Sequence, residues 1–344
     1  MFRLMESTKK RKLNLALQGG GAHGAFTWGV LDRLLQEEDL EIVGVSGTSA
    51  GAVNGACLIY GLTQGGNESA RDVLSEFWKK NSGSQKYSFL QPTIYDKVMS
   101  NGNIDFNPFF WFFSLLSKSL SPYQWNPLMK NSLKELLLDV IDFDAIQKET
   151  NHKLFLTATN IRTSKVKIFH NAEITADAVC ASACLPHLFQ AVEIDGEFYW
   201  DGGYIGNPAM FPLFEQTKCT DLMLIQIDSI NYSKVPTKMS EIFDRATDIS
   251  FNSSLMREMR AISFVTKIID KGFDDDGRLI KTNIHYISTG NLLNNYSGSS
   301  KTNVDWDWLC YLRDSGRTKA EAWIQEHYEK IGKSSSCDIN CIFL

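Results

Sequence analysis

A single serine has the surroundings of a catalytic nucleophile. The stretch Gly47–Thr48–Ser49–Ala50–Gly51 is a G-x-S-x-G pentapeptide that directly follows a short apolar run beginning at Glu41. In a nucleophile elbow the serine occupies a tight strand-to-helix turn, so its neighbours must be very small. Such a turn places the hydroxyl at a helix N-terminus, where free N–H groups favour developing negative charge. We predict Ser49 as the nucleophile, with Gly47 and Gly51 supporting the turn. A bare pentapeptide also fits a turn without chemistry, so its context decides.

A glycine-rich loop precedes this serine. Gly19, Gly20, Gly21, Ala22, His23 and Gly24 follow a predicted strand over residues 12–18 and precede a predicted helix from about 25 to 36. One interpretation is a dinucleotide-binding loop, which needs an acidic residue at the end of the second strand. Glu41 lies before that strand, and the strand ends in the serine pentapeptide. The other interpretation is an oxyanion hole, in which the N–H groups of Gly19, Gly20, Gly21 and Ala22 face a developing negative charge.

Asp201 is the predicted base. It directly follows a predicted strand over 197–200 and is itself followed by Gly202 and Gly203. Asp–Gly alone is a common turn, but here it occurs in a chain that already has an elbow and a candidate oxyanion hole. A carboxylate with a pKa of about 3.9 is a poor base for an alcohol, so burial must raise the pKa. The alternative enzyme is a Ser–His–Asp hydrolase, for which His285 or His327 follows in the required order.

The elements that would position these residues indicate an α/β fold. Two strand–loop–helix units in tandem place both loops at the carboxyl edge of a parallel sheet. Further along the chain, alternating apolar patterns and turn residues predict two hairpins and then two more strands separated by long helices. The expected strands are 153–161 with 165–170, 191–194 with 197–200, 221–228 and 283–289, and the expected helices are 70–80, 132–141, 176–183, 238–271 and 306–331.

Composition narrows the class of protein. The chain has 344 residues, of which 43% are hydrophobic and 22% charged, and this is an ordinary globular composition. A formal net charge of −5 without a long basic stripe argues against a nucleic-acid binder. The run Lys9–Lys12 is interpreted as a solvated tail, without the apolar core of a secretory signal. Seven scattered cysteines favour a reducing, cytoplasmic location, and no motif indicates a metal.

Two apolar segments have an open role. Residues 104–127 are rich in aromatic side chains but too broken by polar residues to span a bilayer. We expect them to pack on the core, the alternative being an exposed lipid-contacting surface or acyl-chain entrance. The last four residues, Cys341–Leu344, form a C-a-a-X box, with Cys337 as a possible second acylation site. We expect an unmodified tail whose apolar residues dock on the core.

Four blocks together resemble the bacterial patatin-like phospholipases, the Ser–Asp lipid acyl hydrolase family. They are the loop 19–24, the elbow 47–51, the helix end 181–186, and Asp201–Gly202–Gly203 followed by Asn207–Pro208. The resemblance implies a three-layer fold with a mostly parallel central sheet flanked by helices. It implies a catalytic domain over 12–230, after a basic tail over 1–11. The remainder, 231–344, would be a largely helical accessory region that packs on or completes this domain.

The resemblance also implies a mechanism. Ser49 and Asp201 would form a dyad that works through an acyl-enzyme, without cofactor or metal, and the glycine loop would stabilise the oxyanion. His23 stands where many relatives carry arginine, so any contact with a phosphate head group there would be weaker and pH-dependent. The implied partner is a lipid or another acyl ester, with peripheral membrane contact. A cytoplasmic protein, with or without peripheral membrane binding, or a secreted effector would fit. A nucleotide-binding regulatory module remains the alternative from another class.

Overall fold

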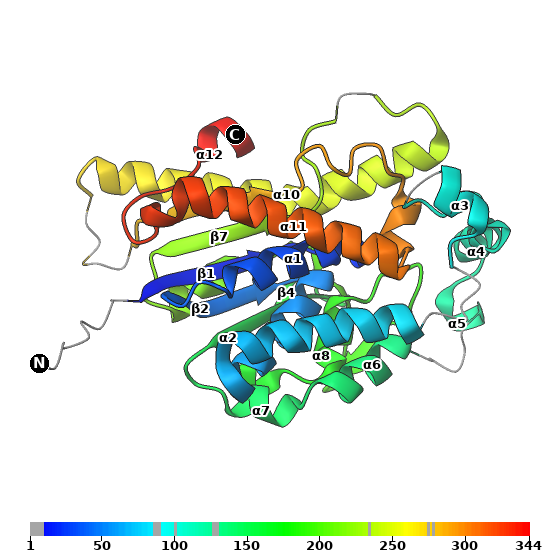
Figure 1. Ribbon diagram of the computed structural model, residues 1–344, viewed down its shortest axis with the longest axis horizontal. Coiled ribbons are helices and arrows are strands. Elements are labelled where there is room, and N and C mark those ends of the chain that lie inside the picture. Colours follow the sequence, from blue (N-terminus) through cyan, green and yellow to red (C-terminus); the bar gives the residue numbers. More distant parts are fainter. Residues whose placement is uncertain are drawn as a thin grey trace, which may run out of the picture.

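The computed structural model describes residues 10–84, 91–99, 102–125, 131–232, 235–273, 276 and 279–344, and side chains for most of them. Figure 1 shows a central sheet between layers of helices. The expected α/β architecture with a mostly parallel sheet is therefore confirmed.

Residues 1–9 of the predicted basic tail lie outside the described residues. Arg11, which we had assigned to this tail, instead begins the first strand and forms ion pairs with Asp39 and Glu329.

The sheet has the strand order β5-β6-β3-β2-β1-β7-β8, and β4 also pairs with β3. Five strands are parallel neighbours: β8 (Asn283–Ser288), β7 (Asp221–Gln226), β1 (Arg11–Leu17), β2 (Leu40–Gly47) and β3 (Lys153–Asn160). The antiparallel strands are β4 (Val166–His170), β5 (Val192–Ile194) and β6 (Glu197–Asp201). Both predicted hairpins are present, and Asp195 and Gly196 have the positive φ angles of a tight hairpin turn.

The pairing of β3 with its neighbouring strands decides the geometry of the site. On β3, residues Phe155 to Thr159 pair with β4 along one edge. The opposite edge is shared, because β2 pairs with β3 up to Leu156 and β6 pairs with it from Ala158 onward. Since β2 and β6 run in opposite directions, their carboxyl ends meet on this edge. The residues that follow β2 and the last residue of β6 are thereby brought together.

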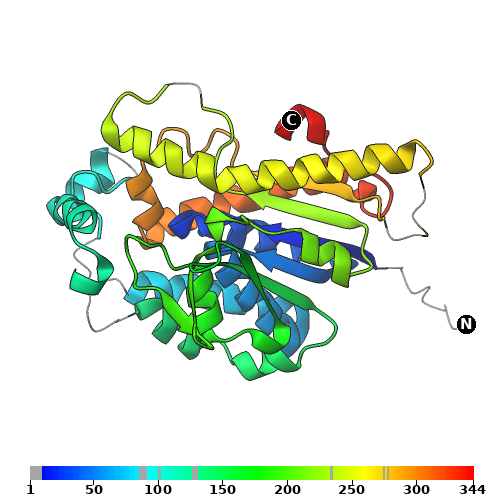
Figure 2. The same ribbon diagram turned by 180° about the vertical axis from the view of Figure 1, so that it is seen from behind.

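Each face of the sheet is covered by helices. Odd-numbered residues of β7 such as Met223 pack with helices on one face, and even-numbered ones such as Leu222 pack on the other. The first layer contains α1 (Gly24–Leu34), α2 (Ala50–Ser84), α6 (Ser132–Val140), α7 (Phe143–Lys148), α8 (Ala176–Ser182) and α11 (Trp306–His327). The second contains α9 (Phe211–Gln216), α10 (Met239–Asp270) and α12 (Ile339–Phe343), seen from behind in Figure 2.

Most of the predicted helices are present, with one clear difference. The helix expected over 70–80 belongs to the long α2, which starts at the serine pentapeptide and is interrupted by non-helical Gly65 and Gly66. The polar composition of residues 62–69 concealed this continuity. None of the described helices is both long and apolar enough to cross a bilayer.

The segment after residue 230 is built into the same sheet and layers. Strand β8 extends the sheet beside β7, and α11 packs along α1. Ion pairs from Arg33 to Glu321 and from Arg317 to Asp32 join these two helices. Phe343 of α12 is buried against Tyr286 of β8, and Cys341 is exposed. The expected docking of the apolar tail on the core is confirmed for Ile339, Ile342 and Phe343, whereas Leu344 is exposed.

A group of short helices forms a cap at one end of the molecule, visible in Figure 1 beyond the carboxyl ends of the parallel strands. It consists of α3 (Ile94–Met99), α4 (Pro108–Ser119) and α5 (Pro122–Trp125). The expectation that the aromatic residues of this region pack on the core is wrong for most of those described. Large apolar side chains of the cap that are 53% to 80% exposed are Ile94, Tyr95, Val98, Phe106, Phe109, Trp111, Phe112, Leu115 and Tyr123.

Short 3-10 turns complete the description. They are η1 (Gly21–His23), η2 (Asn171–Glu173), η3 (Gly202–Tyr204), η4 (Gly298–Thr302) and η5 (Tyr328–Lys330). Three of them, η1, η3 and η4, contain or adjoin residues predicted for the site.

Candidate active site

Ser49 occupies the turn between β2 and α2. Its φ of 55° lies in the left-handed region, which is rare for a residue other than glycine and is typical of a strained elbow. The backbone N–H of Ser49 donates to Oγ of Ser182 at 3.0 Å, and Ser182 in turn donates to the carbonyl of Thr157 at 2.7 Å. Ser182 thus links the elbow to β3.

The other predicted elbow residues allow the backbone to pack closely. A side chain at Gly51 would collide with the carbonyl oxygen of Leu17, and one at Gly47 would collide with Gly51. Thr48 donates from Oγ1 to the carbonyl of Gly206 at 2.7 Å. The elbow is therefore wedged between β1 and the segment that follows η3.

Asp201 is completely buried at the end of β6. Its Oδ1 accepts the N–H of Gly203 at 2.7 Å, and its own N–H donates to the carbonyl of Cys184 at 2.8 Å. Gly202 and Gly203 leave no room for side chains, because Thr157 and Phe251 lie against them. Among the described residues, Oδ2 of Asp201 has no hydrogen-bond partner of normal geometry.

The environment of Asp201 changes its acidity. Burial raises its pKa to about 7, and the N–H of Gly203 and the nearby Ser49 side chain offset only part of this effect. Ser49 therefore lies close enough to interact with the carboxylate, although the contact falls outside normal hydrogen-bond geometry. An aspartate with this pKa is ionised to a large extent at neutral pH and can still accept a proton.

The glycine loop passes directly beside the elbow. A Cβ atom on Gly19 would lie 2.8 Å from Cβ of Ser49. The N–H of Gly19 already donates to Oδ1 of Asn207 at 2.8 Å, so this amide is engaged by the protein itself. Gly20 contacts Ile227, and Gly21 has a φ of 59° with its Cα against the carbonyl of Lys301. Within the described residues, the N–H groups of Gly20 and Gly21 make no backbone hydrogen bond outside helices and strands.

His23 and Gly24 lie behind this loop. His23 is buried, with Nε2 2.8 Å from Oγ of Ser300, and burial with nearby Lys301 lowers its pKa to about 3. It is therefore neutral at physiological pH. Gly24 packs against Ala50 at the start of α2. Since His23 is enclosed and uncharged, it supports the loop and offers no positive charge to a phosphate group.

A buried ion cluster backs the loop from η4. Nζ of Lys301 lies 2.8 Å from a carboxylate oxygen of both Asp228 and Asp248. Burial alone would lower the pKa of Lys301, but the two carboxylates raise it on balance, so the lysine stays charged. Lys301 and its two carboxylate partners, far along the chain from the glycine loop, therefore hold this loop in place.

Several supporting residues were not singled out from the sequence. Ser182 and Asn207 lie within the motif blocks that we recognised, so the blocks contained a signal although no role was assigned. Oγ of Ser254 on α10 accepts a hydrogen bond from the N–H of Asn207 at 3.2 Å. Ser300 and Lys301 belong to no local sequence motif. Only their spatial contacts reveal them.

The two histidines of the alternative triad do not join the site. His285 is buried on β8 with Nε2 2.9 Å from Oδ1 of Asp221, the first residue of β7. His327 ends α11 next to η5, where Tyr328 contacts Arg11 at the start of β1 and Asp39 just before β2. Both lie towards the amino-terminal edge of the parallel strands, whereas Ser49 follows the carboxyl end of β2. The Ser–His–Asp arrangement is therefore not formed.

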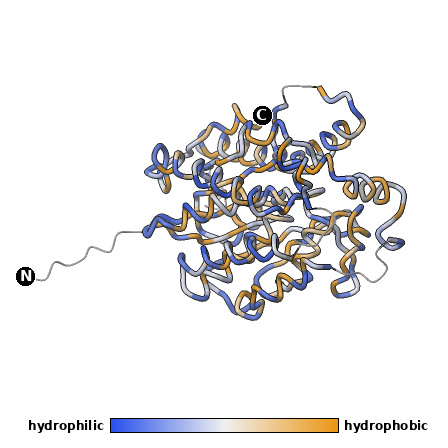
Figure 3. The backbone as a smooth tube through the Cα atoms, turned by 45° about the vertical axis from the view of Figure 1, so that its right-hand side comes forward, coloured by the Kyte–Doolittle hydropathy of each residue, from blue (hydrophilic) through white to orange (hydrophobic). Residues whose placement is uncertain are grey.

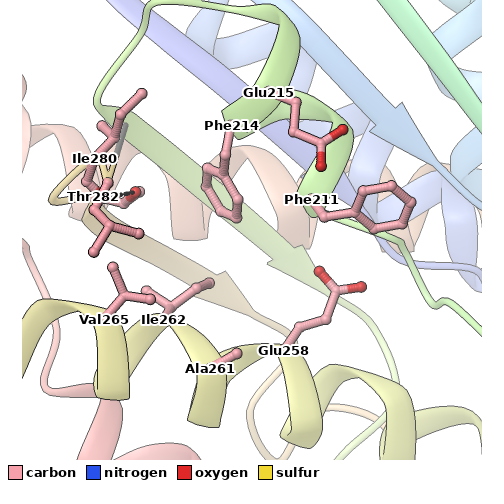
Figure 4. Close-up of a pocket in the computed structure, with 10 residues that line it drawn as sticks. Phe211, Phe214, Glu215, Glu258, Ala261, Ile262, Val265, Ile280 and Thr282 are labelled. Atoms are coloured by element: carbon pink, nitrogen blue, oxygen red, sulfur yellow. Dashed lines mark hydrogen bonds between the residues drawn. The ribbon is translucent and has the colours of Figure 1, made fainter. Parts of the chain in front are cut away.

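A separate cavity of about 420 Å³ lies between α9, α10 and the residues before β8, shown in Figure 4. Its lining residues are Phe211, Phe214, Glu215, Glu258, Ala261, Ile262, Val265, Leu279, Ile280 and Thr282, none of them a predicted site residue. Burial raises the pKa of Glu258 to about 7, and its carboxylate accepts the N–H of Met210 at 2.7 Å. Glu258 thereby fastens the segment after Asn207 to α10.

Comparison with solved structures gives two distant similarities. VipD from Legionella pneumophila has 15% identity and a TM-score of 0.45, with 93% of this chain and 67% of that chain covered. ExoU, in its complex with SpcU from the type III secretion system of Pseudomonas aeruginosa, has 14% identity and a TM-score of 0.33. That alignment covers 94% of this chain and 61% of ExoU, so this chain spans less than two thirds of its length. No curated protein sequence matches this chain.

The sequence model of one family matches residues 15–213, which is more than half of the chain. The match includes the glycine loop, the elbow, Ser182, Asp201 and Asn207, and it ends within α9. The chain belongs to the patatin-like phospholipases, a family of enzymes that hydrolyse acyl esters of lipids.

Proposed function

We propose that this enzyme hydrolyses carboxylic ester bonds of phospholipids or related lipids through a Ser49–Asp201 dyad. The observation that carries the proposal is the buried carboxylate of Asp201, whose Oδ1 is held by Gly203, whose Oδ2 has no hydrogen-bond partner among the described residues, and which interacts with the Ser49 side chain. A base held in this way is fixed in position and keeps one oxygen available to accept a proton from a nearby hydroxyl.

The reaction then has two steps. Asp201 accepts the proton of the Ser49 hydroxyl while Oγ attacks the ester carbonyl carbon, and the proton passes to the departing alcohol. Water next gives its proton to Asp201 and attacks the acyl-enzyme, and Asp201 returns the proton to Oγ as the fatty acid leaves. The carboxylate is regenerated unchanged.

The oxyanion formed in each step needs donors. Because the N–H of Gly19 is engaged by Asn207, we assign this role to Gly20 and Gly21, with Ala22 next in line. Backbone N–H groups fixed in a closed site stabilise such a charge without a metal ion. We therefore expect full hydrolysis in excess chelator.

The test is hydrolysis of a lipid panel by wild type, Ser49→Ala, Asp201→Asn and the double variant. Each single change should reduce kcat by at least about a thousandfold, and the double variant should be no worse, since residues that act as a unit are non-additive. His327→Ala is the matched control and should retain activity. An active Asp201→Asn enzyme, or activity that chelation abolishes and calcium restores, would contradict the proposal.

A further inference from the structure

The end of the molecule that carries the cap has an unusual surface. Besides the exposed cap residues named above, Val235 before α10 and Met239, Ile242 and Phe243 in its first turns are 44% to 85% exposed. We call these two groups together the apolar rim. Soluble proteins rarely expose so many large apolar side chains in one region without a partner.

The two parts of the rim lie side by side. Figures 1 and 2 both place the start of α10 next to α3 and α4, at the end of the molecule opposite the N-terminus, and Figure 3 colours parts of that end as hydrophobic. Ser297 and Gly298, which start η4, join them. The N–H of Ser297 donates to Asn103 in the cap at 2.9 Å, and the N–H of Gly298 donates to Asp244 of α10 at 3.2 Å.

The polarity of the cap is the reverse of that of an ordinary surface helix. Its described charged side chains, Asp96, Lys97 and Asp105, are engaged by protein groups. Asp96 accepts the N–H of Phe106 at 2.7 Å and is buried, Lys97 pairs with Asp305 at 2.6 Å, and Asp105 accepts from Ser297. The exposed side is formed by aliphatic and aromatic residues instead. This distribution suits an apolar environment outside the protein.

The position of the rim identifies the environment. The loop 102–105 of the cap hydrogen-bonds to η4, because Ile104 donates its N–H to Ser299 at 3.1 Å. The next residue, Ser300, contacts His23 behind the glycine loop. The cap is thus joined through η4 to the glycine loop beside Ser49, at the carboxyl edge of the sheet. Tryptophan, tyrosine and phenylalanine beside aliphatic residues are the side chains that settle at a lipid–water interface.

We propose that the apolar rim is a lipid-docking surface, which inserts into the membrane that holds the substrate and places the Ser49 edge against it. The proposal rests on the proposed function in taking the substrate to be a membrane lipid. Docking itself needs no turnover, so the two can be tested separately. Because the contact is apolar, binding to neutral vesicles should depend little on salt.

The experiment is sedimentation of the full chain, carrying Ser49→Ala to prevent hydrolysis, with vesicles of phosphatidylcholine. In this background Trp111→Ser/Phe112→Ser should weaken binding at least tenfold. Phe264→Ser is the matched control, because Phe264 is 63% exposed on the same helix α10 but about 30 Å along it from Phe243. Binding of this control should remain within twofold. Unchanged melting temperatures would show that both proteins are folded, and Val98→Asp provides a second rim variant.

A parallel measurement uses the active enzyme. The double rim variant should lose hydrolysis of long-chain lipid in vesicles at least tenfold, while a soluble short-chain ester is cleaved at the wild-type rate. If the rim variants bind vesicles like wild type, or if no form binds, the proposal is overturned. A concentration-dependent dimer that the rim variants dissociate would also overturn it, in favour of contact with a second copy of the chain.

Discussion

At the scale of single residues, the acidity of Asp201 is the central property of the site. Its pKa of about 7 results from burial, which penalises the charged form more than Gly203 and Ser49 favour it. An ordinary aspartate would be a much weaker base towards a serine hydroxyl. Burial makes the Asp201 carboxylate a stronger base, and it also makes ionisation of Asp201 unfavourable for folding. Each consequence can be measured.

The first consequence concerns the pH dependence of hydrolysis. The base must be ionised before it accepts a proton, so kcat/KM should fall about tenfold per pH unit below pH 6 and level off above about pH 7 to 8. A soluble ester is the suitable substrate, because its own ionisation does not change. A rate that is constant from pH 5 to 8 would contradict the assignment of Asp201 as the base.

The second consequence concerns stability. The pKa of Asp201 is raised in the folded state from 3.8 to about 7, so its ionisation destabilises the fold progressively as pH rises between these values and fully above pH 7. The neutral Asp201→Asn variant avoids this loss. Its melting temperature should therefore exceed that of wild type, by more at pH 8 than at pH 5. A gain that is equal at both pH values would show that ionisation is not the cause.

At the scale of elements, the active-site loops depend on the segment between η3 and α9. Its Gly206 and Ala209 carbonyls accept the hydroxyls of Thr48 and Ser46, and Asn207 holds Gly19. Helix α10 in turn holds this segment through Ser254 and Glu258. One segment therefore fixes the elbow and the glycine loop relative to each other.

This arrangement predicts a positioning role for Asn207. Asn207→Ala removes the acceptor for the N–H of Gly19 and should lower kcat by roughly ten- to a hundredfold with little change in KM, because misplaced donors weaken transition-state binding. Asn207→Asp keeps the acceptor oxygen and should recover part of the loss. Equal kcat in wild type and Asn207→Ala would show that the contact only supports the fold.

At the scale of the whole molecule, the region after residue 230 belongs to the same sheet and helix layers as the part that precedes it. It supplies an outer strand of the sheet, the helix along α1 and the residues that back the glycine loop. It also supplies α12, whose Phe343 closes the second core beside α10 and β8.

The docking of α12 predicts a loss of stability when its anchor is removed. Phe343→Ala should lower the free energy of unfolding by about 3 kcal/mol, the low end for a buried phenylalanine at the edge of a core. Leu344→Ala is the neighbouring control, since Leu344 is 49% exposed and should change stability by less than about 0.5 kcal/mol. Denaturant unfolding measures both, and equal effects would mean that α12 is not a stabilising contact.

The sequence by itself determined the elements and the two loops that they present. Alternating apolar residues specify strands, and small residues at 19–24 and 47–51 permit turns that no larger side chain allows. These signals are local, so they can be read without knowledge of the fold. The hairpin that ends in Asp201 was predicted for the same reason.

The tertiary structure alone decided which residues meet. The end of β6 at Asp201 lies beside the turn at Ser49 because β2 and β6 both pair with the same edge of β3, and no local pattern records these two pairings between distant segments. Chain order allowed His285 as a partner, but β8 places its ring beside Asp221. The exposure of the aromatic cap could not be predicted from the sequence either. A sequence shows that a side chain is apolar, but only packing decides whether protein covers it.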